Sequence, residues 1–454
     1  MDKNLDNKII TKSPGKSLLS GGYLILDKSK RGLVINIDAY ITCKSFYLIK
    51  PKEREKENNI LLFNIYSDYL KQTFYYNIFF KSNNNKEIEF EISEKNNNDN
   101  KWIKNSIISS LIFYLSYFDY LNNLINDKNI IEINIRTESD YKFYSYSKDN
   151  VSKNVKTGLG SSSAFINSLT TNLILIYDSY FRGKKYQKTV IKKIDDENIK
   201  AIILGSCLLS NNLSQNKIGS CFDIISSLFG SQIFSQTKQN IFLDHPCKLN
   251  DEVKTKVNNL ISYLKSDYIP NIFYFNEKNE YSQNKIFFIS IEIGSDTRIF
   301  VKKVLDYANN KKKEKLFDDE LFSKLNEFNE KIINIFLNGI NDNDIILKEF
   351  CINYRSILRK ISEESHVDIE PKILIPLLDN LIKNSNIIYA ICPGAGGYDS
   401  IIIIGKENIK DSILIKEINN IINNFNNENL NKQLNIKANL FQANIPIDSG
   451  TIIY

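Results

Sequence analysis

The chain has 454 residues, enough for roughly two or three domains with a large buried core. Its formal net charge is +6, and lysines are interspersed with acidic residues, whereas nucleic-acid-binding proteins usually concentrate their basic residues. Six cysteines without a Cys-x-x-Cys pair, together with two histidines, argue against a zinc site and a Ser-His-Asp triad. The sequence shows no signal peptide and no apolar run of membrane-spanning length. We therefore expect a cytoplasmic protein with reduced thiols and neither a membrane nor a nucleic-acid partner.

Hydrophobic periodicity predicts alternating strands and helices along the chain. In the first half we expect strands at 33–47, 60–66 and 130–137, and helices at 102–124, from 162 onward and at 199–213. In the second half we expect strands at 285–293, 387–392 and 400–406, helices at 297–308, within 316–364 and at 372–384, and a helix or loop in the Asn-rich tract 419–431. Long helices beside antiparallel strands indicate an α+β fold. Apolar periodicity lapses around 237–251, so the predicted domains are 1–240 and 241–454.

The segment 155–164, Val-Lys-Thr-Gly-Leu-Gly-Ser-Ser-Ser-Ala, precedes the long apolar run 165–180. Its two glycines allow a sharp turn and a close approach of the backbone to a ligand. The three serines follow at the expected start of a helix, where free N–H groups and the positive helix end favour phosphate. A serine oxygen suits the magnesium ion that accompanies ATP. The spacing is not that of a P-loop, and a plain helix cap is the alternative interpretation.

Two further glycine-rich segments lie near the two ends of the chain. Residues 12–27 read Lys-Ser-Pro-Gly-Lys-Ser-Leu-Leu-Ser-Gly-Gly-Tyr-Leu-Ile-Leu-Asp, and residues 392–400 read Cys-Pro-Gly-Ala-Gly-Gly-Tyr-Asp-Ser. Together with segment 155–164, they resemble the three signature loops of the GHMP small-molecule kinases, and in detail those of eukaryotic phosphomevalonate kinases. Segment 215–223, Gln-Asn-Lys-Ile-Gly-Ser-Cys-Phe-Asp, extends this resemblance, which covers nearly the whole chain.

The resemblance implies a two-lobed GHMP kinase fold with the active site between the lobes. It also implies transfer of a phosphoryl group from ATP, with Mg²⁺, to (R)-5-phosphomevalonate, giving the diphosphate in the mevalonate route to isoprenoids and sterols. Lys16 would lie at the reacting phosphate, Ser162 would bind the metal, and Asp223 would take or orient a proton. The expected catalytic residues are Lys16, Lys217 and Asp223, and the expected nucleotide-binding residues are Lys156, Thr157, Gly158, Leu159, Gly160, Ser161, Ser162, Ser163, Asn100 and Trp102.

The acceptor in this reaction is itself a phosphate. Its second pKa is about 6, so at neutral pH most of it lacks the proton that a base would remove. Charge screening therefore matters more than base catalysis, because a dianion must approach the polyanionic nucleotide. The expected substrate-binding residues supply cations, hydroxyls and backbone N–H groups: Lys12, Ser13, Gly21, Gly22, Tyr23, Ser67, Ser145, Ser220, Arg355, Gly394, Ala395 and Gly396.

Several residues depart from the family pattern. Cys221 stands where glycine is expected, which strains the turn before Asp223 if this position needs a positive φ. Leu374, Ile375 and Lys142 differ from the usual residues around the acceptor. The alternatives are a mevalonate kinase, disfavoured by the Gly-Gly-Tyr at 21–23, and an inactive ligand-binding regulator, disfavoured by intact Lys16, Ser162 and Asp223. The sequence gives no oligomeric state.

Overall fold

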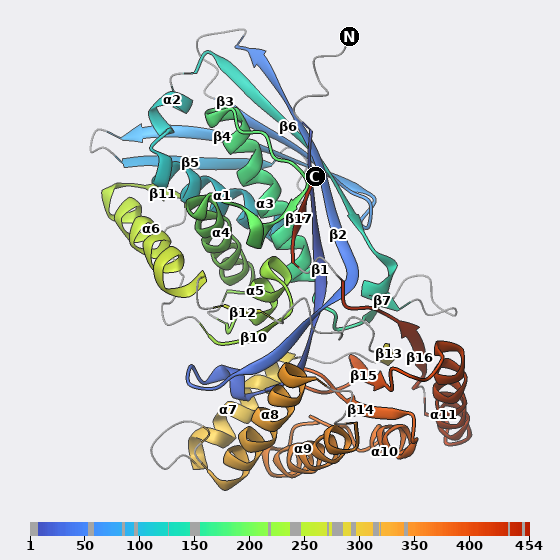
Figure 1. Ribbon diagram of the computed structural model, residues 1–454. Coiled ribbons are helices and arrows are strands. Elements are labelled where there is room, and N and C mark those ends of the chain that lie inside the picture. The colour runs from blue at the N-terminus through green and yellow to red at the C-terminus, as the bar shows by residue number, and fades with distance from the viewer. Residues whose placement is uncertain are drawn as a thin grey trace.

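A computed structural model gives the structure at residues 8–52, 59–83, 87–94, 99–125, 127–145, 155–216, 219–236, 247–269, 272–274, 285–291, 297–311, 317, 319–339, 344–434, 436–446 and 450–454. Within these ranges, no helix combines the length and the apolar character needed to cross a membrane. The described elements form two bodies, each with its own hydrophobic core, and the long strands β1 and β2 run through both (Figure 1).

The first body is built on a large, mostly antiparallel sheet. Its strand order is β11-β5-β4-β3-β6-β2-β1-β17-β9, with β10 paired to β2 and β12 paired to β10. The strands are β1 (Ile9–Ser20), β2 (Gly32–Pro51), β3 (Asn59–Ser67), β4 (Gln72–Asn83), β5 (Glu87–Glu94), β6 (Asn129–Ser139), β9 (Thr189–Val190), β10 (Gln232–Phe234), β11 (Lys248–Leu249), β12 (Phe273–Tyr274) and β17 (Ile452–Ile453). The last of them, β17, pairs with β1, so residues from opposite ends of the sequence lie side by side.

Helices cover one face of this sheet (Figure 1). They are α1 (Lys101–Phe118), α2 (Leu121–Ile125), α3 (Ser161–Arg182), α4 (Glu197–Gln215), α5 (Phe222–Phe229) and α6 (Asp251–Tyr263). Helix α3 packs against β1 and β2 and is almost wholly buried, which explains its long apolar sequence. The isoleucines of β6 at 131, 133 and 135 point into the same core, as their strict alternation predicts.

The second body has a four-stranded antiparallel sheet in the order β14-β15-β13-β16, flanked by helices. Its elements are β13 (Lys285–Ile291), α7 (Thr297–Lys311), α8 (Glu320–Asn338), α9 (Asp344–Ser365), α10 (Ile375–Lys383), β14 (Ile387–Ile391), β15 (Ser400–Gly405), α11 (Asp411–Asn431) and β16 (Ala438–Gln442). Helices α9 and α10 pack on β14, and α11 packs beside β16. The predicted α+β class is confirmed, and the Asn-rich tract 419–431 is helical.

The fold differs from the sequence-based expectations at several places. The predicted helix 102–124 is broken at Asp119, which takes a left-handed φ of 53°. Lys16, which follows the Pro14-Gly15 pair, lies within strand β1. The domain boundary at residue 240 stays a prediction, and the elements that follow it, β11 and α6, pack in the first core.

Helices α1 and α4 approach each other closely at Gly205, where a Cβ would lie 2.1 Å from Cε1 of Phe113. We expect Gly205→Ala to lower the free energy of unfolding by about 1–3 kcal/mol, because overpacking outweighs the helix propensity gained. Urea unfolding measures this value. Repeating the substitution in a Phe113→Leu background removes the ring, so its cost should fall; an equal cost in both backgrounds would contradict the contact.

Candidate active site

The glycine loop at 157–160 is tied down before its helix begins. Strand β8 (Val155–Lys156) pairs with β7 (Tyr144–Ser145), and the Thr157 hydroxyl donates to the Lys142 carbonyl at 2.7 Å. The Thr157 N–H donates to the Phe143 carbonyl at 3.1 Å. The loop therefore leaves the strand in one fixed direction, with Thr157 serving as an anchor.

Helix α3 begins immediately after this loop. Gly160 is its N-cap residue, with a left-handed φ of 77°. Because glycine has no side chain, the cap residue does not accept hydrogen bonds from the first N–H groups of the helix. The Ser163 hydroxyl turns back to the Gly160 carbonyl at 2.7 Å, whereas Ser162 is half-buried in the first turn. The helix start thus presents backbone donors and one serine hydroxyl, which is an arrangement that suits phosphate oxygens.

Lys16 lies against this helix start. Its N–H donates to the Leu159 carbonyl at 2.9 Å, and a Cβ at Gly160 would lie 2.7 Å from Lys16 Cε. The ammonium lies 5.0 Å from the centre of the Phe222 ring. Burial lowers the pKa of Lys16, and the carboxylates of Asp223 and Asp399 oppose that shift. The structure therefore brings a desolvated cation, two acids and the glycine loop into one site.

Asp223 lies in the first turn of α5, where its Oδ1 accepts from the Ile224 N–H at 3.1 Å. The preceding Cys221 has a left-handed φ of 57°, so the position does need the conformation that favours glycine. The Cys221 thiol lies between Asn211 (3.7 Å) and Asn212 (3.4 Å). The strained turn is thus held by side-chain contacts that fix the start of the helix carrying Asp223.

The third glycine-rich segment, 393–399, is latched to β1 and to the loop before α10. The Tyr23 hydroxyl donates to the Ala395 carbonyl at 2.7 Å, and the Gly394 N–H donates to the Leu18 carbonyl at 3.3 Å. On the other side, the Gly397 N–H donates to the Ile369 carbonyl at 2.9 Å. We call these three bonds the loop latch.

The loop latch changes the interpretation of the Gly-Gly-Tyr segment. The Gly21 N–H donates to the Tyr354 hydroxyl at 3.1 Å, and a Cβ at Gly22 would lie 3.2 Å from the Gly394 carbonyl oxygen. The Tyr23 side chain is 1% exposed. Gly22 and Tyr23 therefore contact the third loop and help to position it, while Gly21 lies against Tyr354; their expected role in substrate binding stays a prediction.

The anion nest expected at 394–396 is smaller than predicted. The Gly394 N–H is bonded to Leu18, and the Gly396 N–H donates to the Pro393 carbonyl at 3.2 Å. Of the three donors, the Ala395 N–H is the one that has no hydrogen-bond acceptor within the described part of the chain. A substrate oxygen can therefore take one backbone donor here rather than three.

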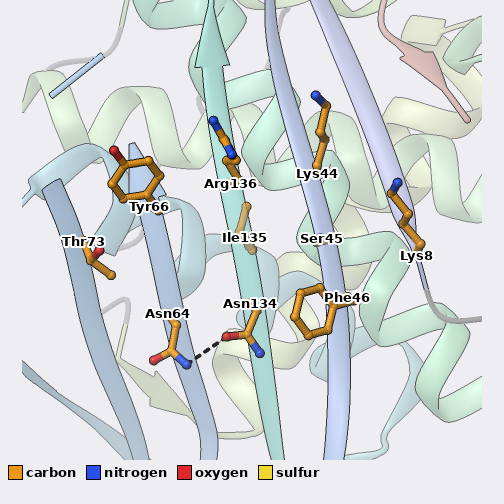
Figure 2. Close-up of a pocket in the computed structure, with 10 residues that line it drawn as sticks. All are labelled: Lys8, Lys44, Ser45, Phe46, Asn64, Tyr66, Thr73, Asn134, Ile135 and Arg136. Atoms are coloured by element: carbon orange, nitrogen blue, oxygen red, sulfur yellow. Dashed lines mark hydrogen bonds between the residues drawn. The ribbon is translucent and has the colours of Figure 1, made fainter. Parts of the chain in front are cut away.

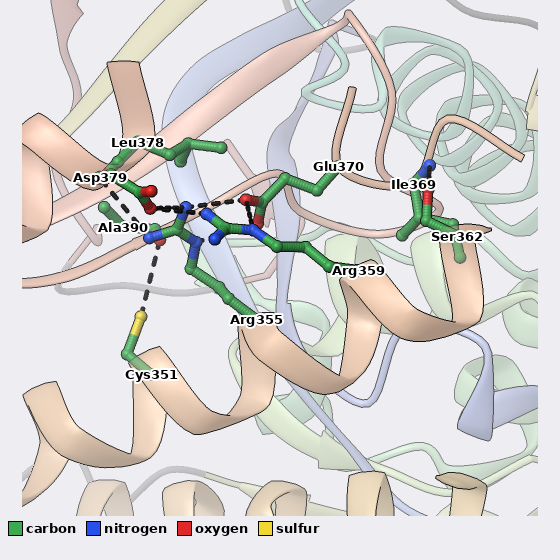
Figure 3. Close-up of polar contacts among 9 residues, drawn as sticks. All are labelled: Cys351, Arg355, Arg359, Ser362, Ile369, Glu370, Leu378, Asp379 and Ala390. Carbon is green, nitrogen blue, oxygen red and sulfur yellow. Dashed lines mark hydrogen bonds and ion pairs between the residues drawn. The ribbon is translucent and has the colours of Figure 1, made fainter. Parts of the chain in front are cut away.

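Arg355 takes part in a buried ion-pair network, and its expected role in screening substrate phosphate stays a prediction. Its guanidinium meets both oxygens of Glu370, at 2.8 and 2.9 Å, and Asp379 at 2.9 Å (Figure 3). Arg359 joins the same two carboxylates. Arg355 and Glu370 are only 2% and 4% exposed, so their charges are used within the fold. Because Glu370 follows Ile369, this network holds the loop latch in place.

Other predicted residues also have structural partners. The Ser13 hydroxyl is buried against Thr451 at 2.8 Å, and the Ser67 hydroxyl accepts from the Leu70 N–H at 3.3 Å. Asn100 caps α1 by accepting from the N–H groups of 102 and 103, and Trp102 packs against the first core. Ser13 and Ser67 were expected to bind substrate, and their hydroxyls are instead engaged in the fold.

The remaining predicted residues lie at different distances from this site. The Lys12 ammonium is 4.1 Å from the centre of the Tyr40 ring, whereas the Lys16 ammonium lies over Phe222. Ser220 is half-buried one residue before Cys221, and Ser145 pairs with Val155 beside the glycine loop. Lys156 is exposed at the start of that loop. Lys217 lies outside the described residues.

Two of the three residues that differ from the family pattern around the acceptor, Leu374 and Lys142, are engaged in the fold. Leu374 is fully buried in the second core. The Lys142 ammonium is paired with Asp38 at 2.8 Å, and Asp38 also accepts from the backbone and side chain of Asn444.

The sequence analysis did not name Asp399 as a site residue. The signal that could have found it was its place near the end of the third glycine-rich segment.

A separate groove of about 580 Å³ lies on the outer face of the large sheet (Figure 2). Lys8, Lys44 and Arg136 line it beside aromatic and amide side chains. Lys44 is paired with Glu138 at 2.6 Å, and Arg136 is paired with Asp68 at 2.8 Å. None of the predicted site residues lines this groove, so the glycine loops define a different site.

The fold is that of the GHMP kinases. A Streptococcus pneumoniae phosphomevalonate kinase, solved with phosphomevalonate and AMPPNP, superposes with a TM-score of 0.54 at 14% identity, covering 95% of this chain and 99% of that one. A Methanococcus jannaschii mevalonate kinase superposes with a TM-score of 0.50 at 19% identity, covering 96% and 98%. No family model matches the sequence.

Among curated proteins, the sequence is similar to phosphomevalonate kinases. That of Aspergillus fumigatus is 24% identical, covering 87% of this chain and 87% of the relative. That of Candida albicans is 24% identical, covering 87% and 89%. The resemblance inferred from the three glycine-rich segments is thereby confirmed.

We expect Glu370→Gln to lower the free energy of unfolding by about 3–5 kcal/mol, because it leaves the buried Arg355 and the partly exposed Arg359 with one carboxylate, Asp379. Urea unfolding measures the change. Glu330→Gln is the matched control: Glu330 pairs with Arg31 where both side chains are partly exposed, so its loss should cost less than about 1 kcal/mol. Similar small losses in both variants would show that the network does not stabilise the fold.

Proposed function

We propose that the chain is an ATP-dependent phosphomevalonate kinase that converts (R)-5-phosphomevalonate to the 5-diphosphate in the mevalonate pathway. The observation that carries this proposal is the meeting of the three glycine-rich segments around Lys16. In the reaction, an oxygen of the acceptor phosphate forms a bond to the γ-phosphorus of ATP, and the bond to ADP breaks. Such transfers depend mainly on positioning and on cations near the developing oxygen charge.

The start of α3 is the proposed site for the nucleotide phosphates. The uncapped N–H groups after Gly160 point along a helix whose positive end favours anions. Ser162 supplies a hydroxyl for Mg²⁺, an ion that proteins commonly bind through few side chains together with substrate phosphates. In the described ranges, no cluster of three or more His, Cys, Asp or Glu side chains forms a separate metal site. The residues present therefore fit a metal that is shared with the nucleotide and neutralises its charge.

Lys16 and Asp223 are the proposed residues at the transferred group. The Lys16 ammonium is placed at the glycine loop by a backbone bond to Leu159, so it can offset charge on the moving phosphoryl group. Asp223 lies within electrostatic reach of Lys16. Because a phosphate acceptor is already largely ionised at neutral pH, Asp223 is proposed to orient the acceptor and the ammonium rather than to act as a strong base.

The first test compares acceptors. A site built for a phosphorylated acid leaves its own donors unpaired when the phosphate is absent, so kcat/KM for phosphomevalonate should exceed that for mevalonate by at least roughly 10³. An assay that couples ADP release to NADH oxidation, run with each acid in turn, measures the ratio. Comparable values for the two acids would overturn the phosphomevalonate assignment in favour of a mevalonate kinase.

A second test removes the two groups at the phosphates. Lys16→Ala and Ser162→Ala should each lower kcat by about 100-fold or more, because each loses an electrostatic contact made to the transferring phosphoryl group. Lys193→Ala, which removes an exposed lysine elsewhere in the first body, is the control and should retain full activity. Lys16 lies in a strand, so thermal unfolding of each variant must accompany the assay. Normal turnover in a folded variant would remove that residue from the proposed mechanism.

A further inference from the structure

Asp399, near the end of the third glycine-rich segment, lies close to the same loop as Lys16. A Cβ at Gly158 would lie 3.1 Å from Cβ and 3.9 Å from Cγ of Asp399. Two residues along, a Cβ at Gly160 would lie 2.7 Å from Lys16 Cε. The aspartate and the lysine therefore lie over one short loop, although they come from different bodies of the protein.

The backbone that carries Asp399 is fixed from both directions. The loop latch joins residues 394, 395 and 397 to β1, Tyr23 and Ile369. Immediately after Asp399, buried Ser400 begins β15 and pairs with Ser290 of β13. Because its neighbours are held on both sides, the carboxylate has a defined position relative to the glycine loop.

The negative charge of Asp399 lies close to the proposed phosphate site. A carboxylate near a nucleotide and a second phosphate repels both unless a cation offsets its charge. Lys16 is a cation within electrostatic reach of Asp399, and Asp223 on α5 acts on the same ammonium. The Phe222 ring covers the ammonium from the same helix, and the loop residues Gly158, Leu159 and Gly160 carry no charge.

We propose that Asp399 is a positioning residue that holds the Lys16 ammonium at the glycine loop, so that the second body supplies a charged group to the phosphate-transfer site. This inference rests on the proposed function. Asp223 and Asp399 together fix the cation from α5 and from the third loop. Without Asp399, Lys16 keeps one carboxylate and loses the one that is attached to the second body.

The proposal predicts that removing the charge of Asp399 lowers turnover without weakening ATP binding. Asp399→Asn keeps the shape of the side chain but removes its charge, so the repulsion of nucleotide phosphate falls while Lys16 loses its orientation. We expect kcat to fall by about 10- to 100-fold, with no rise in the KM for ATP. Asp368→Asn is the matched control, because Asp368 contacts Tyr398 on the exposed side of the same loop and should leave both constants unchanged.

A direct readout on Lys16 needs no turnover. Trace acetylation of the whole protein, with peptide mass spectrometry across a pH series, gives the midpoint at which Lys16 becomes reactive. Loss of a neighbouring negative charge disfavours the protonated amine, so Asp399→Asn should move this midpoint down by about one pH unit. Asp399→Ser is the second variant if the Asp399→Asn protein does not fold. Asp368→Asn should leave the midpoint unchanged.

The outcomes separate this inference from the proposed function. Wild-type protein that is inactive with phosphomevalonate, while Asp399→Asn still shifts the Lys16 midpoint, overturns the function and retains the contact. Active wild-type protein with an unshifted midpoint in folded Asp399 variants overturns the inference alone. A raised Mg²⁺ requirement in Asp399→Asn, with the midpoint unchanged, would make Asp399 a metal ligand and also overturn the proposal.

Discussion

The site depends on one backbone contact, the hydrogen bond from the Lys16 N–H to the Leu159 carbonyl at 2.9 Å. It joins strand β1 to the loop that precedes α3. The approach is possible because neither side has a bulky residue: a Cβ at Gly15 would lie 2.9 Å from that carbonyl oxygen, and one at Gly160 would meet the Lys16 side chain. The glycines in these two segments therefore serve the contact between them as well as any ligand.

The third glycine-rich segment is also fixed by close contacts, but here side chains rather than backbone groups make them. Tyr23 and Tyr354 are buried, and their hydroxyls bond backbone groups of the third loop and of Gly21. A buried hydroxyl without a partner is costly, so each tyrosine specifies one arrangement of the backbone. Behind the loop, the Arg355 and Glu370 network specifies the path of residues 367–371 in a similar way, through charges that are unfavourable to bury singly.

The sequence was sufficient to predict the class of fold, because hydrophobic periodicity is a local property. That the three glycine-rich segments share a site was implied by their resemblance to the GHMP kinase loops. The sequence was less informative about individual roles. Arg355, Tyr23 and Ser13 have the chemistry of ligand-binding residues, and only tertiary contacts show that Glu370, Ala395 and Thr451 engage them. The sequence raised the positive φ at position 221 only as a condition, because cysteine stands where the family has glycine, and the structure meets that condition with a φ of 57°. Asp399 was overlooked because its importance depends on which loop lies opposite it.

Strand β17 has a consequence for the order in which the chain acquires its structure. Residues 451–453 complete the sheet beside β1, and Thr451 bonds Ser13 across 438 positions of sequence. Contacts of such separation form late, because a long loop must close before they contribute free energy. During synthesis, β1 can pair early with β2, which follows it closely in the sequence, whereas its other edge is completed only when residues 451–453 have left the ribosome. The contact between Ser13 and Thr451 is therefore among the last contacts of this sheet to form.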